Sequence, residues 1–559
     1  MKKLTLLFLM CLGSWGIALG QSALAPLNTE YYHLIDRYEI KQGTFSKSFH
    51  SYVKPYHRKA IVEFIEGVQE ADIAKSKVDQ FNLEYLLSDS WEWTKEEHGV
   101  NQKPFLKHFY KRKPDLYHVN DPDFDLHINP VLYFSVGKDN QLSSTPYINS
   151  RGLELRGNIG KKVGFYSFIT DNQTRFPLYV QQEIAKNGAV PGEGFWKVVD
   201  GDSQDFFSPR GYITFNFTKQ ISFQFGHDKN FWGQGYRSTV LSDYSNNYLF
   251  AKINTKVWRI NYTNLFAKMT ANNQDKVSGH YPRKYITSHH LSVDVTDHLN
   301  IGLFETIVFS RQDSLGNNHF EPDYLNPIIF YRAVEHDLGD PDNVLIGMDF
   351  KWNLMNRFQL YGQYTLDELL VDVMVNGNGD WKNKFAGQLG GKYIDAFGVS
   401  NLDLQLEFNA IRPYMYSHKG DVMYQNYQHF TQPLAHPKGA NLLEYVGIIR
   451  YQPLPRLSLK LMGMYTKTGE DGEGENWGAD LSKDYNTRQQ DVGNTIGQGI
   501  STKIAYVDLN VSYMLFHNLF LDFQQTFRNF NSEDDTRDLN TSFTNFSLRW
   551  NIPQRRHEF

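Results

Sequence analysis

Residues 213–226 read ITFNFTKQISFQFG, and every second residue in each half of this stretch is apolar. Ile213, Phe215 and Phe217 alternate with polar residues, and the same alternation resumes at residue 221 after Lys219-Gln220. Successive side chains of a β-strand point to opposite faces, so each half predicts a strand with one apolar and one polar face. The two residues between the halves predict a tight antiparallel hairpin.

The same alternation recurs along most of the chain. It is found at 348–354 with a return strand from 358, and again at 402–409, 457–461, 509–515 and 545–552. Tight turns alternate with long polar segments at 172–209, 312–343, 376–384, 412–440, 466–501 and 531–541. Short turns on one rim and long loops on the other are typical of bacterial outer-membrane barrels.

The fold class predicted is therefore an all-β transmembrane protein, an antiparallel outer-membrane β-barrel over residues 123–559. About 430 residues, at roughly 22–27 per strand with its loop, give 16–20 strands, and the preference for even numbers favours 18. A lipid-facing charge at the bilayer midplane costs on the order of 2–4 kcal/mol. We therefore expect a polar lumen that receives the charges of the strands: Asp349, Lys351, Asp403, Glu407, Arg259 and Asp508.

Residues 1–20 have the features of a secretion signal. Lys2 and Lys3 precede an apolar run at 4–12, and Ala18-Leu19-Gly20 offers a small-residue cleavage site. The signal predicts export and an integral location in the cell outer membrane. Cys11 is the only cysteine, so the chain after cleavage has no thiol for a disulfide, a cysteine zinc site or a cysteine nucleophile.

Residues 21–122 differ from the rest of the chain. Apolar residues recur at spacings of three and four within 58–74 and 77–93, for example at Ile61, Phe64, Ile65 and Val68, which indicates helices. We expect a small, partly helical N-terminal region. Two roles are open for it: a periplasmic cap, or a plug inside the barrel.

The segment 226–269 departs from plain alternation. It contains Gly226-His227-Asp228, then Trp232-Gly233-Gln234-Gly235-Tyr236 and Leu241-Ser242-Asp243, and further on Trp258. With the supporting stretches at 151–157 and 326–330, the chain from about residue 125 resembles the Wzi-like capsule-assembly outer-membrane proteins and the RemB-type gliding-motility proteins of Bacteroidota. The resemblance implies a monomeric barrel of about 18 strands. It further implies a role in capsular polysaccharide retention, or in surface motility that depends on type IX secretion.

Five residues of this segment are the candidate site. Asp228, Arg237 and Asp243 are expected to form a charged network in the lumen, and Trp232 and Tyr236 to stack against sugar rings. The alternative is structural: the glycines fold a loop inward and the charges pair to brace the barrel.

Other chemistry is poorly supported by the sequence. His289 and His290 are adjacent on a predicted strand and must face opposite sides, and the acidic stretch 470–475 lacks the spacing of an EF-hand. The chain has no HExxH, P-loop or GxSxG motif. We predict no catalytic residue, no metal and no cofactor, and the net charge of -5 argues against a nucleic-acid partner.

Two functional hypotheses remain. The first is a non-enzymatic surface protein that supports gliding motility or polysaccharide attachment, with outer-membrane lipid, surface polysaccharide and gliding or type IX secretion components as partners. The second is a porin or solute transporter, which needs a continuous wet path through the lumen.

Overall fold

The computed structural model describes residues 22–199, 201–273, 279–312, 318–330, 342–367, 378–419 and 424–559. The predicted signal at 1–20 lies outside these residues. The wall consists of β3 (Phe124–Asp139), β4 (Tyr147–Ile159), β5 (Val163–Arg175), β7 (Gln204–Asn216), β8 (Ile221–Asp228), β10 (Tyr248–Val257), β11 (Ile260–Thr270), β12 (Arg283–Asp294), β13 (Leu299–Phe309), β16 (Asn343–Leu354), β17 (Phe358–Asp367), β18 (Phe385–Tyr393), β19 (Leu402–Ile411), β22 (Leu442–Leu454), β23 (Leu457–Glu470), β24 (Ile500–Phe516), β25 (Leu519–Ser532) and β26 (Leu539–Trp550).

The wall is a closed antiparallel barrel of these eighteen strands. The last strand closes it on the first, with Phe543 opposite Asp139 and Trp550 opposite Leu132. The predicted hairpin is confirmed, since β7 and β8 pair from Gly211 opposite His227 down to the turn at 217–220. The predicted fold class and strand number are therefore confirmed. In the described part of the chain, no helix is long and apolar enough to span a membrane.

The two faces of the wall differ as the alternation predicts. The outward side chains include a band of exposed apolar residues: Val136, Leu153, Phe207, Phe225, Met348, Leu389, Leu406, Val507, Leu521, Phe527 and Phe546. The charges of Asp349, Lys351, Asp403, Glu407 and Asp508 are buried on the opposite, lumen face. The expectation for Arg259 is wrong. It lies in the short turn between β10 and β11, where it donates to Asp297 at 3.0 Å, because a turn at the rim leaves its charge in contact with water.

One outward patch carries polar groups, and the chain covers it. His289 and Glu305 are paired across β12 and β13. The segment 318–330, which contains the 3₁₀ turn η2 (Pro322–Leu325), lies over them. The backbone N–H of Phe330 donates to Glu305 at 2.8 Å, and the hydroxyl of Tyr262 donates to the carbonyl of Pro327. His290, on the other face of β12, bonds Asp349 in the lumen at 2.8 Å.

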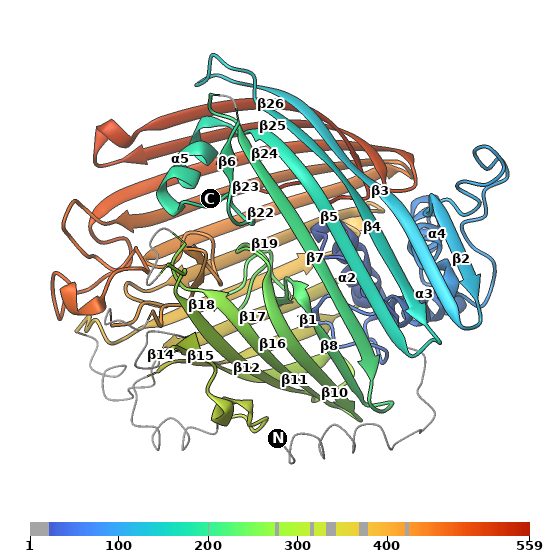
Figure 1. Ribbon diagram of the computed structural model, residues 1–559, viewed down its shortest axis with the longest axis horizontal. Coiled ribbons are helices and arrows are strands. Elements are labelled where there is room, and N and C mark those ends of the chain that lie inside the picture. Colours follow the sequence, from blue (N-terminus) through green and yellow to red (C-terminus); the bar gives the residue numbers. More distant parts are fainter. Residues whose placement is uncertain are drawn as a thin grey trace.

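The short turns lie at one rim and the long loops at the other. Helices α2 (Thr29–Gln42), α3 (Arg58–Glu70) and α4 (Lys77–Asp89), followed by η1 (Trp91–Trp93) and β2 (Tyr117–Asp121), lie at the short-turn end (Figure 1). Helix α5 (Leu178–Asn187), from the long connection between β5 and β7, lies at the opposite end. The shorter elements are β1 (Val53–Lys54), β6 (Lys197–Val198), β9 (Phe231–Trp232), β14 (Arg311–Gln312), β15 (Asn318–His319), η3 (Ala396–Gly398), β20 (Gln428–His429), β21 (Gln432–Pro433), η4 (Tyr485–Thr487) and η5 (Asp535–Arg537).

The helices form because their sequences supply caps as well as apolar faces. Asn28 caps α2 by accepting from the backbone of Glu30 and Tyr31, and Gly43 ends it in the left-handed conformation. Ser76 caps α4 in the same way. Helix α3 and α4 with η1 match the two predicted helical stretches, whereas α2 is not indicated by the apolar spacing.

Helix α2 is held in the lumen by ion pairs with the wall. Glu30 pairs with Arg450 on β22, Asp36 with Lys392 on β18, Arg37 with Asp403 on β19, and Glu39 with Lys351 on β16. All but Glu30 are almost completely buried. Four charges of the wall, on β16, β18, β19 and β22, are therefore paired with charges of the N-terminal region.

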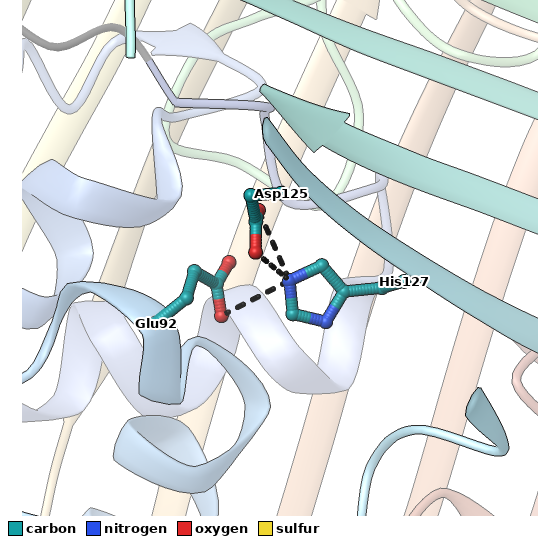
Figure 2. A group of neighbouring side chains, drawn as sticks. All are labelled: Glu92, Asp125 and His127. Atoms are coloured by element: carbon teal, nitrogen blue, oxygen red, sulfur yellow. Dashed lines mark hydrogen bonds and ion pairs between the residues drawn. The ribbon is translucent and has the colours of Figure 1, made fainter. Parts of the chain in front are cut away.

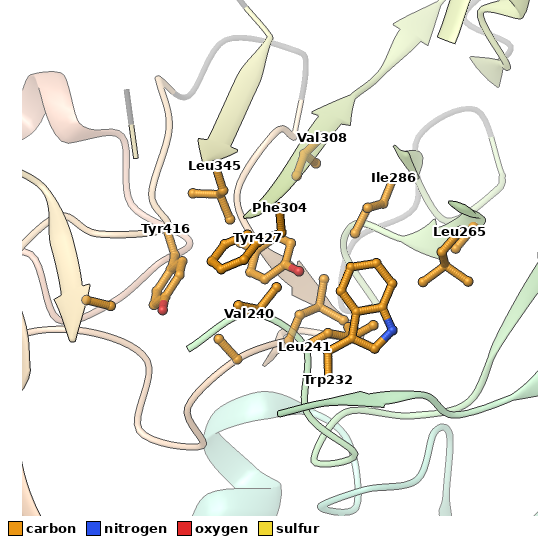
Figure 3. Close-up of a cluster of buried hydrophobic side chains, with 14 of the residues drawn as sticks. Trp232, Val240, Leu241, Leu265, Ile286, Phe304, Val308, Leu345, Tyr416 and Tyr427 are labelled. Atoms are coloured by element: carbon orange, nitrogen blue, oxygen red, sulfur yellow. The ribbon is translucent and has the colours of Figure 1, made fainter. Parts of the chain in front are cut away.

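The lumen also contains an apolar core, which the sequence did not indicate. Trp232, Val240 and Leu241 from the loop after β8 pack against wall residues such as Phe304 and against Tyr416 and Tyr427 of the loop after β19 (Figure 3). The predicted polar lumen thus also contains apolar surface that the strand alternation does not reveal. Long loops that fold inward exclude water there and supply apolar partners for the wall.

The chain after β26 turns back into the lumen. The wall ends at Trp550, two residues before the predicted end of the strand, and residues 551–559 form no strand. Phe559 is buried against Phe176, Tyr179 and Ile184 near α5. Residues 553–559, called the C-terminal tail below, thus run from the short-turn rim towards the long-loop end.

Candidate functional site in the barrel lumen

Residues 229–247, called the inward loop below, carry four of the five candidate residues into the lumen. The loop adds a short strand to the N-terminal region, because β9 pairs with β1 and places Trp232 opposite Val53. Two glycines permit this path. Gly233 has a φ of +143°, and a Cβ on Gly235 would lie 2.5 Å from the Glu407 carboxylate. Folding the loop inward, the role that the structural alternative gives the glycines, is what their geometry provides.

Trp232 lies inside the apolar core and is completely buried. Figure 3 shows its indole beside Leu241 and facing the side chains of β11–β13. Its carbonyl accepts from the Ser238 hydroxyl at 2.7 Å, which tightens the loop. A sugar could therefore stack on this ring only after the core had opened.

Arg237 and Tyr236 are the centre of a buried polar network. The Arg237 guanidinium donates to both Glu444 carboxylate oxygens, at 3.0 and 3.3 Å. The backbone N–H groups of Tyr236 and Arg237 donate to the two oxygens of Glu407, at 2.7 and 3.0 Å. The buried charge of Arg237 is thus paired with a wall carboxylate, as buried charges require, and Glu407 is bound by backbone N–H groups of the loop.

Asp243 pairs with the C-terminal tail, not with Arg237. Its carboxylate accepts from Arg556 at 2.5 Å. Burial by itself raises the pKa of this carboxyl, but Arg556 and Lys229 outweigh it and hold the pKa below its usual range. Lys229 donates to the carbonyls of Gly192 and Asp243, at 2.7 and 3.1 Å. Burial, reinforced by Arg210, lowers its pKa to about 8.

Asp228 lies apart from the other candidates. It ends β8, and its Oδ1 accepts from the backbone N–H of Lys229 at 2.8 Å. Within the described ranges, no hydrogen bond joins it to Arg237 or Asp243. The three charged residues therefore do not form one directly bonded network.

The C-terminal tail links the two halves of the site. Glu558 accepts from the Tyr236 hydroxyl at 2.7 Å, and its carbonyl accepts from Arg237 at 2.6 Å, while Arg556 holds Asp243. Arg555 donates to the side-chain oxygens of Glu193 and Asn172. Sequence reasoning missed the tail because Arg555-Arg556 lie beyond the last alternating segment, at 545–552. The signal that could have revealed it is that cluster of charge where a terminal strand should be apolar.

A cavity of about 300 Å³ adjoins this network, small for a ligand pocket. It is lined by the start of α2, by the wall, by the inward loop and by the whole C-terminal tail. Ten cationic side chains line it: Arg37, Arg210, Lys229, Arg237, Arg450, Arg456, Lys460, Arg549, Arg555 and Arg556. Only five carboxylates do so: Glu30, Glu193, Asp243, Asp403 and Glu558. Cationic side chains thus outnumber carboxylates in the lining, although Arg37, Arg237 and Arg549 are also paired with carboxylates behind it, those of Asp395, Glu444 and Asp522.

The cavity extends to the short-turn rim. Arg456, in the turn between β22 and β23, lines it and is exposed. Tyr236 and Tyr166 add aromatic surface deeper inside. Guanidinium groups pair with carboxylates, and aromatic rings pack against the C–H groups of a saturated ring. The two together suit a ligand whose rings carry carboxylates.

The acidic stretch at 470–475 has local partners. Asp471 pairs with Lys483 at 3.1 Å, and Glu475 accepts from the indole of Trp477 at 2.7 Å. These groups serve the fold of the loop, in keeping with the absence of EF-hand spacing.

Comparison with known proteins finds similarity to solved structures but no match to a family model or a curated sequence. Among solved structures it is similar to Wzi, an outer membrane protein involved in group 1 capsule assembly in Escherichia coli that is described as a carbohydrate-binding β-barrel. The TM-score is 0.57 with 14% identity, over 95% of this chain and 100% of that one.

Two porin-like structures match more weakly. OprD of Pseudomonas aeruginosa has a TM-score of 0.41 and 10% identity, over 76% of this chain and 94% of its own. OccAB2 of Acinetobacter baumannii has the same TM-score and identity, over 76% and 97%. The predicted resemblance to Wzi is confirmed for the fold, whereas the RemB-type and Bacteroidota assignments stay predictions.

Proposed function

We propose that the protein is a non-enzymatic, monomeric barrel of the outer membrane that binds surface polysaccharide and keeps it at the cell. The observation that carries the proposal is a lumen filled by the chain itself around one cation-rich cavity. A protein built to pass solutes needs a continuous wet path, and a protein built to attach a polymer does not.

Four segments occupy the lumen. The N-terminal helices fill the short-turn end through ion pairs with the wall. The inward loop and the loop after β19 form the apolar core, and the C-terminal tail fills the remaining side. This arrangement favours attachment over the porin alternative.

The cavity favours an acidic glycan. Cationic side chains in its lining outnumber carboxylates by two to one. Arg456 at the rim donates to the backbone carbonyl of Leu515 at 3.3 Å. An exposed guanidinium that is not engaged by a carboxylate is suited to receive one from a ligand. Tyr236, Arg237 and Asp243, from the predicted site, lie deeper and would be reached by a longer chain.

Binding by the purified protein tests the ligand class. Calorimetry should detect an oligosaccharide that contains uronic acid and should not detect a neutral oligosaccharide of equal length. Arg456→Gln should weaken binding several-fold, because it removes a cation at the mouth of the cavity. Arg357→Gln is the matched control, since Arg357 is an exposed turn arginine on the same rim outside the cavity. Equal binding of both sugars, or equal loss in both variants, would contradict the proposal.

A deletion strain tests the cellular role and the alternatives together. Increased shedding of polysaccharide with normal growth supports attachment. Normal retention with lost colony spreading would instead favour the gliding-motility hypothesis and its type IX secretion partners. Normal retention and spreading, with ion conductance by the purified protein in planar bilayers, would establish the porin alternative.

A further inference from the structure

A second polar cluster lies where the N-terminal region meets the first wall strand, away from the cation-rich cavity. Asp125 and His127 alternate on β3 and therefore share its lumen face, and Glu92 comes from η1. Figure 2 shows the two carboxylates converging on one nitrogen of the His127 ring. One donor atom from each of the three residues lies within 4.8 Å of the other two.

The imidazole is oriented by a fourth residue. Nδ1 of His127 lies 2.8 Å from the carboxylate of Asp115, which is completely buried and also accepts from the Trp91 indole at 2.6 Å. A metal-ligating histidine typically uses its second nitrogen to donate to a carboxylate in this way. Nε2 is left facing Asp125 and Glu92.

Glu92 offers a carboxylate oxygen that the protein does not use. Oε1 accepts from Arg156, whereas Oε2 has no hydrogen-bond partner among the residues that the structure describes. The Glu92 side chain is only 4% exposed. A buried carboxylate oxygen without a donor is costly, and a bound cation would remove that cost.

The distances and charges fit a divalent ion. Nε2 lies 3.1 Å from Asp125 Oδ1 and 3.8 Å from Glu92 Oε2. Neighbouring ligands of tetrahedral zinc lie about 3.4 Å apart, given bond lengths near 2.1 Å. Glu92, Asp115 and Asp125 bring three negative charges and Arg156 one positive charge, so an ion of charge +2 beside a neutral imidazole makes the cluster neutral. An imidazole with carboxylates selects a transition metal over magnesium or calcium.

We propose that Glu92, Asp125 and His127 bind one divalent transition-metal ion, represented by zinc, with Asp115 as the residue that positions the imidazole. The ion ties η1 of the N-terminal region to β3 and so helps to fix that region in the barrel. The proposal is independent of the polysaccharide function.

Metal titration of the purified full-length protein tests the site. Cobalt(II) gives visible d–d absorption that reports its ligands, and zinc should displace it with one equivalent per chain. His127→Gln should abolish the cobalt spectrum. His290→Gln is the matched control, because His290 is also a buried histidine bonded to a carboxylate, Asp349, but belongs to no group of three possible ligands in the described part of the chain. Retention of the spectrum in His127→Gln, or its loss in both variants, would overturn the proposal.

Two further measurements separate metal binding from an effect on folding. Asp115→Asn should keep the site but weaken zinc binding about 10- to 100-fold, since it alters the group that orients the ligand. Zinc should also slow proteolysis at the exposed stretch 102–107 in the wild type and not in Glu92→Gln. If the wild type binds no cobalt and zinc does not change its proteolysis, the cluster is an imidazolium paired with carboxylates and the proposal fails.

Discussion

Replacing Arg37 by methionine should release the N-terminal region from the lumen. The Arg37 side chain is 1% exposed and serves three carboxylates, those of Asp403, Asp395 and Asp79. Methionine keeps much of the apolar stem and removes the charge. Removing one partner of a buried ion pair costs about 3–5 kcal/mol, because the other charge stays buried without compensation.

Neighbouring groups reduce this cost but do not cancel it. Lys41 lies 2.8 Å from Asp79 and 2.9 Å from Asp395, and His33 lies 2.9 Å from Asp403. We therefore expect the lower end of the range, about 3 kcal/mol, which corresponds to a roughly 100-fold larger population of the released state. Hydrogen exchange of the α2 amides measures that population directly, and bilayer conductance reports whether the lumen opens with it.

Two variants are controls for this prediction. Lys41→Met removes a cation from the same cluster, but its side chain is 15% exposed, so its effect should stay below tenfold. Adding Asp403→Asn to the methionine variant removes one uncompensated charge and should restore part of the protection. Unchanged α2 exchange in the Arg37 variant, or an equal effect in the Lys41 variant, would refute the role assigned to the ion pairs.

Three further predictions concern the apolar core, stability at low pH and ligand binding at high pH. Trp232→Ala should lower the free energy of unfolding by about 3–5 kcal/mol in denaturant titrations, whereas Trp258→Ala, in an exposed turn, should change it little. Burial raises the pKa of Asp395, but Arg37 outweighs it and the pKa is lowered to about 2. The ion pair of Asp395 with Arg37 therefore stabilises the docked N-terminal region above about pH 4, and this stabilisation is lost towards pH 2. Bilayer conductance should appear as the pH falls through this range. Burial is the main cause that lowers the pKa of Lys229 to about 8, so this side chain loses its charge as the pH rises. Acidic oligosaccharides should therefore bind more weakly at about pH 9 than at about pH 7. The variant Lys229→Met should remove this pH dependence of binding.

The wall was predictable from the sequence because one physical cost dominates it. A charge facing lipid is so unfavourable that the period of two assigns Asp349, Asp403 and Glu407 to the lumen without any knowledge of their neighbours. Arg259 escaped the rule because a rim turn is in contact with water. Glu305 shows the other limit, since a carboxyl residue can lie on the outward face when the chain itself covers it.

The site was predictable only in part. The glycines at 233 and 235 indicate an unusual loop, and Arg237 indicates a buried charge, but no sequence spacing links residue 237 to Glu444 or Glu558. Those pairs arise from barrel closure and from the return of the C-terminal tail. The sequence analysis did not single out Asp125 and His127, which share one face of a strand, and Glu92 joins them only because η1 docks there.

Helix α2 shows why a helix that packs inside the lumen is difficult to predict from the sequence. Helices in globular proteins are usually detected by an apolar stripe that faces a core. Helix α2 is buried on two sides. Tyr32, Ile35 and Tyr38 pack in an apolar cluster with α3 and α4. Asp36, Arg37 and Glu39 instead meet the charged inner face of β16, β18 and β19. These charges interrupt the apolar pattern of the helix, and their complementarity to the wall can be recognised only once the inward charges of the wall are known. A search for N-terminal plugs in other barrels should therefore match the helix charges to the predicted lumen charges of the strands.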